Sequence, residues 1–258
     1  MARGSRPKSR RVAATPEPLP PERRTIGQLI AEAIKAYTGN FAKALPLGLI
    51  VAAINQVAIG VSAASTALVL VAAAPFFTIA YAYASRVAHG PPPTRRAWLV
   101  ALAAGTLVWI PAALLFPWFA LAGILWLGLV GLAVPAAMVE GTTFVGSLRR
   151  GLQLGRADYV HSAGTLAALL ILFILTRFVL ALLLESQADN TVRTAIFLSD
   201  TVLAPLLFLG GALLYVDQEA RLRSRDDRRE ERDGDVPDAD DADREGSPDA
   251  AREPGAAS

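Results

Sequence analysis

The sequence predicts an all-α fold, a polytopic membrane bundle of six transmembrane helices with two interfacial amphipathic helices and disordered termini. Three observations predict this class. No charged residue occurs between Lys43 and Arg86, and none occurs between Arg96 and Glu140. Each run is about twice the ~20 apolar residues that a membrane-crossing helix needs, so each accommodates two helices and a turn. The whole chain is 53% hydrophobic and 19% charged, with a mean hydropathy of +0.40.

The charges divide the chain into two parts of opposite sign. Residues 1–216 contain 17 Lys and Arg against 8 Asp and Glu, whereas residues 217–258 contain 8 Arg against 15 Asp and Glu. A basic excess beside apolar runs is typical of cytoplasmic loops in membrane proteins, so it predicts membrane orientation and no nucleic-acid partner. The chain has no Cys, which excludes disulfides and thiolate metal sites.

The chain is expected to begin with a disordered, basic and Pro-rich cytoplasmic arm at 1–24, without a signal peptide. An integral membrane domain at 25–216 follows, opening with an amphipathic helix at 25–39. Thr25 and Gln28 have the spacing of a capping box, in which each side chain bonds the other residue's backbone N–H. One apolar stripe follows at helical spacing, so this helix is expected to lie in the headgroup plane. The stripe is Ile26, Leu29, Ile30, Ala33, Ile34 and Tyr37.

Apolar periodicity and turn residues then predict the membrane spans and a second interfacial helix at 142–154. A turn is expected at Phe116-Pro117-Trp118, between two spans. Beyond Asp217 the chain is mostly charged, with Gly, Pro and Ala between, so 217–258 is expected to be a disordered, net acidic tail. The predicted spans are 41–61, 66–85, 97–115, 119–139, 160–184 and 194–216.

The loop charges predict the topology. Six spans put every basic segment on one side and leave the opposite turns uncharged or mildly acidic, which satisfies the positive-inside rule with both termini cytoplasmic. The frequent Ala and Arg suggest a bacterial protein, so the expected location is the bacterial inner membrane. The basic segments are the N-terminal arm, 86–96, 149–156 and 221–225.

Charged and amide residues inside the predicted spans form one candidate site. Arg177 in the fifth span and Asp200 in the sixth are expected at similar depth, because a short loop joins these spans. Asn55 and Gln56 reach the same outer third from the first span. This cluster has three interpretations: an ion pair that fastens helices, a substrate or proton path, or an arginine that reaches the interface.

The remaining candidates lie at the cytoplasmic face. Glu140 is expected either to complement the N-terminal dipole of the 142–154 helix or to pair with Arg149 or Arg150. No catalytic motif occurs, and the two histidines, His89 and His161, are far apart. We therefore expect no enzyme activity, no metal site and no cofactor.

Three stretches together resemble a known family. They are the opening Thr25–Phe41, the run Pro135–Glu140 with Ser147–Arg150 and Leu154, and the exit Leu214–Asp217 with Arg221 and Arg223. Over most of 25–225 the chain resembles the bacterial glycerophosphoryl diester phosphodiesterase membrane-domain family and related six-span proteins. Gly151 departs from the Ser that this family often has. The catalytic barrel, with its paired histidines and metal-binding carboxylates, has no counterpart here, so the resemblance implies a membrane module of unknown activity and does not identify the chain as a phosphodiesterase.

The sequence therefore favours a non-enzymatic accessory, anchoring or lipid- and partner-organising module. Its expected partners are membrane lipids, including anionic headgroups at the cytoplasmic face, and a protein partner of the acidic tail. The alternative is a small transporter or permease-like subunit that uses the buried polar cluster, with a weak internal repeat at an offset of 118 residues as its second motive.

Overall fold

The computed structural model describes residues 20–89 and 94–234, and these residues form helices joined by short turns, with no strand among them. The all-α expectation is confirmed for this part of the chain. The predicted disorder at 1–19 and 235–258 lies outside the described residues. The helices are η1 (Pro21–Arg23, 3-10), α1 (Ile26–Gly39), α2 (Phe41–Ala58), α3 (Ala63–His89), α4 (Arg95–Val130), α5 (Ala133–Glu140), α6 (Phe144–Ala157), α7 (Tyr159–Leu183) and α8 (Asp189–Gly234).

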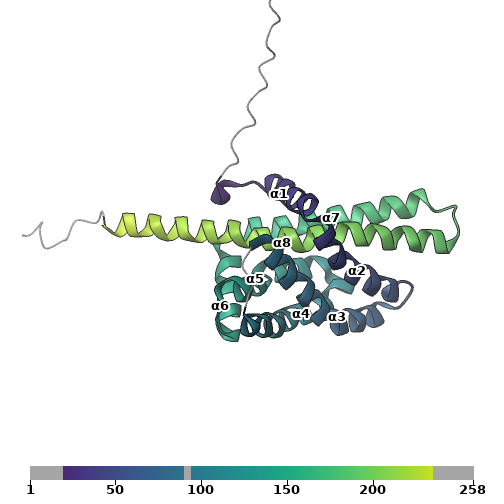
Figure 1. Ribbon diagram of the computed structural model, residues 1–258, viewed down its shortest axis with the longest axis horizontal. Coiled ribbons are helices and arrows are strands. Elements are labelled where there is room, and N and C mark those ends of the chain that lie inside the picture. Colours follow the sequence, from purple (N-terminus) through teal and green to yellow (C-terminus); the bar gives the residue numbers. More distant parts are fainter. Residues whose placement is uncertain (1–19, 90–93, 235–258) are drawn as a thin grey trace, which may run out of the picture.

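The longest helix, α8, runs the length of the molecule with α7 beside it (Figure 1). In this view α1 lies on one side of α8, and α2 to α6 lie on the other. The main core joins α2, α3, α4, α5, α7 and α8 with Tyr37 of α1, and it is built largely from buried Ala together with a few aromatic side chains. Small residues let helix backbones approach closely, which is the usual packing of helices in membranes.

Five stretches are long and apolar enough to cross a membrane, which supports a membrane protein. Each predicted span overlaps one of these stretches, and most ends of the stretches lie within a few residues of the predicted ends. These stretches are Phe41–Ala58, Ala63–His89, Arg95–Glu140, Tyr159–Leu183 and Asp189–Arg229.

The stretch Arg95–Glu140 contains a chain reversal. Phe119 has non-helical backbone angles, with φ −137° and ψ 62°. The indole N–H of Trp126 donates to the carbonyl of Val108 at 2.9 Å. Residues eighteen apart in a straight helix would lie about 27 Å from each other, so α4 is a hairpin of two arms. The turn predicted at 116–118 lies immediately before Phe119.

The second arm of this hairpin is interrupted, although the sequence predicted one span at 119–139. It ends at Val130, and α5 continues from Ala133. Pro135 lacks the N–H that would bond the carbonyl of Gly131 four residues earlier, so the break falls one turn before the proline.

Glycines mark the closest helix contacts. A Cβ on Gly48 of α2 would lie 1.8 Å from the backbone oxygen of Thr201 in α8. On α6, a Cβ on Gly151 would lie 2.5 Å from the Ala133 nitrogen, and one on Gly155 would lie 2.1 Å from the Leu129 oxygen. The G-x-x-x-G of α6 therefore packs within the molecule, against α5 and the end of α4.

The segments predicted as amphipathic helices, 25–39 and 142–154, coincide closely with the helices α1 and α6. The capping box of α1 forms as expected, with the Thr25 N–H donating to Gln28 Oε1 at 2.9 Å and the Gln28 N–H donating to Thr25 Oγ1 at 3.4 Å. Part of the apolar stripe of α1 packs inside the molecule, because Leu29, Ala33 and Tyr37 are buried. Leu29 packs in a second apolar cluster with residues of α5, α6 and α8.

The predicted disorder of the last segment is wrong for its first part. Residues 217–234 continue α8 without interruption, and Asp217 and Gln218 are completely buried. The physical reason is that their polar groups bond to other helices, which charge content alone does not reveal. The last residues of the predicted arm at 1–24 are also structured, since η1 covers 21–23 and Arg24 contacts Asp217.

Candidate functional site

The first candidate site is the Arg177–Asp200 cluster, which comprises Arg177, Asp200 and Asn55 from α7, α8 and α2. The Asn55 amide donates to Asp200 Oδ2 at 2.9 Å, and Arg177 Nε lies 3.5 Å from Asp200 Oδ1. Asp200 is completely buried, whereas 27% of the Arg177 side chain is exposed. The structure thus brings together three of the four residues that the sequence grouped.

Helix direction explains how Asn55 reaches Asp200. Each Cα–Cβ bond in a helix tilts toward the N-terminus of that helix. The contacts Gly48–Thr201 and Gln56–Arg193 show that α2 and α8 are antiparallel, so the two side chains lean toward each other. The Arg177 guanidinium also lies 5.7 Å from the centre of the Phe173 ring, within the range of a cation–π contact.

Gln56 lies apart from this cluster. Its amide donates to the backbone carbonyl of Arg193 at 2.9 Å. This bond fastens the end of α2 to the first turns of α8. Gln56 therefore contributes to helix packing and forms no hydrogen bond with Asp200 or Arg177.

Glu140 pairs with one of its two predicted partners. Arg150 Nε lies 2.7 Å from Glu140 Oε1, and the Tyr215 hydroxyl donates to the same oxygen at 2.8 Å. Arg149 is exposed and forms no ion pair among the described residues. Glu140 thus links the end of α5 to α6 and to α8, and its bond with Tyr215 was not predicted from the sequence.

A second polar site, the Asp217 cluster, was missed by sequence reasoning. It comprises Arg24, Asp158, His161, Asp217, Gln218 and Arg221, and it lies where α8 passes η1 and the start of α7. Arg24 lies 3.2 Å from Asp217 Oδ1, and His161 Nε2 lies 3.8 Å from Asp217 Oδ2.

The rest of the Asp217 cluster surrounds the start of α7. Arg221 lies 2.8 Å from Asp158 Oδ2 and also donates to the Arg24 carbonyl at 2.8 Å. The Gln218 side chain both accepts from the Asp158 N–H and donates to the Asp158 carbonyl, each at 3.1 Å. Residues 217, 218 and 221 lie within one turn of a helix, and this spacing is the only sequence signal that could have indicated a shared buried face.

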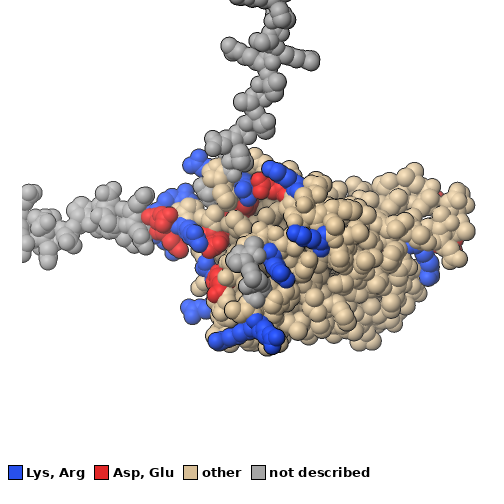
Figure 2. Space-filling view, in the orientation of Figure 1, with Lys and Arg blue, Asp and Glu red and all other residues tan. Residues whose placement is uncertain are grey.

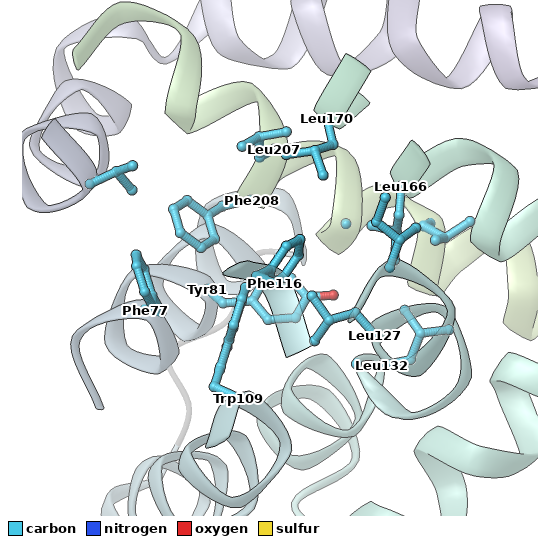
Figure 3. A pocket seen from close by; sticks show the side chains of 15 residues that line it. Phe77, Tyr81, Trp109, Phe116, Leu127, Leu132, Leu166, Leu170, Leu207 and Phe208 are labelled. Carbon is cyan, nitrogen blue, oxygen red and sulfur yellow. The ribbon is translucent and has the colours of Figure 1, made fainter. Parts of the chain in front are cut away.

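An apolar cavity of about 170 Å³ lies inside the bundle (Figure 3). Tyr81 of α3 and Trp109 of α4 line it and are the only lining residues with polar side-chain atoms. The other lining residues come from α2, α3, both arms of α4, the segment after α4, α7 and α8, and include Phe77, Phe116, Leu170 and Phe208. In Figure 3 the Tyr81 hydroxyl points among these hydrocarbon side chains. This cavity was not predicted from the sequence, because its wall combines residues from helices that are far apart in the chain.

The described residues hold no group of three or more His, Cys, Asp or Glu side chains that could bind a metal ion. His161 contacts Asp217, and His89 stacks edge-on against the Tyr215 ring at 5.5 Å. Comparisons with protein-family models, curated proteins and solved structures gave no match for this chain.

Proposed function

We propose that this chain crosses the bacterial inner membrane six times, with both ends in the cytoplasm, and serves there as a non-enzymatic, lipid-binding accessory module. Two arms of α4 running in opposite directions support a count of six, since they divide the stretch Arg95–Glu140 into two crossings. Contacts among the predicted cytoplasmic segments support the topology. Arg24, His89, Glu140 and Asp158 each contact a residue of α8 between 215 and 221.

The distribution of charge also supports this orientation. Lys, Arg, Asp and Glu side chains gather toward the end of the molecule where α8 projects beyond the other helices (Figure 2). Much of the remaining visible surface carries no charge. Leu68, Leu99, Val160 and Leu183 are among many large apolar side chains exposed on this body, as expected where lipid is the solvent.

The apolar cavity is the observation that carries the lipid-binding function. A dry cavity of about 150 Å³ lined by Leu, Ile and Phe holds a six-carbon ring, so this cavity of about 170 Å³ has room for a comparable segment of hydrocarbon. Within a membrane the abundant molecules of that chemistry are acyl chains. The cavity therefore suits part of one lipid chain, with Tyr81 as its single hydroxyl.

The test fills the cavity from α7. Leu170→Phe adds volume to a half-buried cavity-lining residue, whereas Leu175→Phe makes the same change at a position that is 55% exposed on the same helix. Each purified, detergent-washed variant is examined by native mass spectrometry for retained lipid. We expect Leu170→Phe to lose a bound lipid that the unmodified chain and Leu175→Phe retain. Equal lipid retention by all three proteins would rule the cavity out as a lipid site.

The second candidate function is a small transporter or permease-like subunit. Its support is Asp200, a completely buried carboxylate beside a partly exposed arginine, which is an arrangement that proton paths use. None of Arg177, Asp200 and Asn55 lines the cavity, so no continuous polar route joins them through it. Proteoliposomes loaded with a pH-sensitive dye separate the two functions: the lipid-binding module gives no proton flux, and the transporter gives a flux that Asp200→Asn abolishes.

A further inference from the structure

A basic cleft lies between α6 and α8, beyond the apolar body. It has a volume of about 440 Å³. Arg150, Gln153 and Arg156 line it from α6, and Leu222, Arg225, Asp226 and Arg229 line it from α8. The sequence placed the segments 149–156 and 221–225 on the same side of the membrane, and the structure joins them in a single cleft.

The cleft has more positive than negative charge available for a ligand. The Arg150 charge is already matched by Glu140 at 2.7 Å. Arg225 donates to the Ala157 carbonyl at 2.7 Å, which holds its guanidinium in place but leaves its charge unmatched. Arg156 and Arg229 form no ion pair with another described residue. Among the residues whose side chains the structure describes, Asp226 is the only carboxylate that lines the cleft, so three of these arginines face one acidic group.

A neighbouring cleft shares Ala157 and Arg225 and has the same balance of charge. Arg23, Arg221, Arg225 and Arg228 line it together with Asp158 and Asp227. Because Arg221 is bonded to Asp158 at 2.8 Å, three arginines face Asp227 there. The two clefts differ in their other groups: Gln153 adds a neutral donor to the α6–α8 cleft and Leu222 an apolar wall, whereas the Ser224 hydroxyl of the neighbouring cleft already donates to the Ala220 carbonyl at 3.0 Å.

We propose that the α6–α8 cleft binds the phosphate headgroup of an anionic phospholipid. Guanidinium groups match phosphate geometry with paired N–H donors, and the Gln153 amide adds a neutral donor. Basic pockets at the cytoplasmic ends of membrane helices bind such headgroups. Val160 is 81% exposed only three residues after the cleft residue Ala157, so the cleft borders a surface that suits acyl chains. This inference rests on the proposed cytoplasmic position of α6, but it does not depend on the apolar cavity.

The test compares two double variants of the full chain in detergent. Arg156→Gln with Arg229→Gln removes two cleft charges, one on each helix. Arg149→Gln with Arg223→Gln removes the same charge from the same helices at positions that do not line the cleft. Native mass spectrometry measures the affinity of each protein for phosphatidylglycerol and for phosphatidylcholine. We expect the cleft variant to lose about tenfold or more in affinity for phosphatidylglycerol, and the control to stay within about twofold.

A gain of affinity provides a second readout that misfolding cannot imitate. Asp226→Asn removes this carboxylate from the cleft, and we expect it to bind phosphatidylglycerol several-fold more tightly. Affinity for phosphatidylcholine should remain the same in all of these variants. Equal losses in the cleft and control variants would show general surface attraction and overturn the site.

Two further experiments are needed. One distinguishes a lipid phosphate from free phosphate as the ligand, and the other tests the cleft independently of the apolar cavity. Inorganic phosphate is added as a competitor: if it alone binds as tightly as phosphatidylglycerol, the lipid assignment is overturned. Leu170→Phe is titrated with the same lipids, because filling the cavity should weaken both lipids alike. A loss confined to phosphatidylglycerol in the arginine variant supports the cleft even if Leu170→Phe has no effect, so each proposal can fail alone.

Discussion

Two buried carboxylates on the same helix, Asp200 and Asp217, are held in contrasting ways. Asp200 has one amide partner and an arginine 3.5 Å away, both from helices that pack directly against α8. Asp217 has an arginine at 3.2 Å from a segment 193 residues earlier in the chain, and its neighbours Gln218 and Arg221 bind the start of α7. Asp200, which lies in an apolar run, is thus bound by adjacent helices alone. Asp217, at the end of the bundle, lies in a polar cluster that connects segments far apart in the sequence.

The first prediction concerns a truncated chain that lacks the α8 residues of the Asp217 cluster. A chain that ends at Val216 lacks Asp217, Gln218 and Arg221, and leaves the charges of Arg24 and Asp158 without these partners. We expect a loss of stability on the order of 5 kcal/mol, or failure to purify as a monodisperse species. A chain that ends at Gly234 keeps every contact described above and serves as the control. Thermal unfolding followed by tryptophan fluorescence in detergent gives the comparison, and equal melting temperatures would contradict it.

The second prediction concerns a single buried charge. Asp217→Asn leaves the Arg24 guanidinium without its carboxylate 3.2 Å away, and only Glu32 remains, at 3.6 Å. Breaking a buried ion pair costs about 3–5 kcal/mol, and we expect the lower end because Glu32 keeps part of the interaction. The control is Glu219→Gln, whose partner Arg223 is 73% exposed, with an expected loss of about 0.5 kcal/mol or less. A milder effect for Asp217→Asn than for Glu219→Gln would mean that the buried pair is not holding η1.

The third prediction applies a double-mutant cycle to Arg177 and Asp200. Arg177→Leu and Asp200→Asn are combined, and the free energy of unfolding is measured for each single and for the double change. We expect a coupling of about 1 kcal/mol, the scale of polar contacts between membrane helices, so that the double variant is milder than the sum. Gln56→Ala with Arg177→Leu is the matched control and should be additive within about 0.5 kcal/mol. If the Arg177–Asp200 pair is equally additive, the ion pair is not a stabilising contact.

Whether a site could be predicted from the sequence depends on the residues next to it in the chain. Arg177 and Asp200 stand alone in apolar runs, where a charge is costly and needs a partner, so the sequence predicted their proximity. The turn before Phe119 and the Thr25–Gln28 capping box were predicted because local residue types determine them. Asp217 begins a segment in which many residues are charged, so its burial had no distinct local signal.

What the sequence missed depends on contacts between distant segments. The high average charge of residues 217–234 predicts disorder. In the structure these residues are helical, and Asp217 and Gln218 are buried beside η1 and the start of α7. The apolar cavity combines residues as far apart as Val51 and Leu214, all of which looked like ordinary membrane-facing positions. Only the packed structure distinguishes an apolar residue that faces a cavity from one that faces lipid.

The 46-residue α8 is about 69 Å long, more than twice the ~30 Å thickness of the hydrocarbon layer, and Pro205 lies inside it without ending it. It carries Asp200, Asp217 and two of the cleft arginines, Arg225 and Arg229, on one continuous helix. No loop interrupts this helix between Asp189 and Gly234. The Arg177–Asp200 cluster and the α6–α8 cleft are therefore connected through one continuous element, so a change in the tilt of α8 at one site changes the geometry at the other.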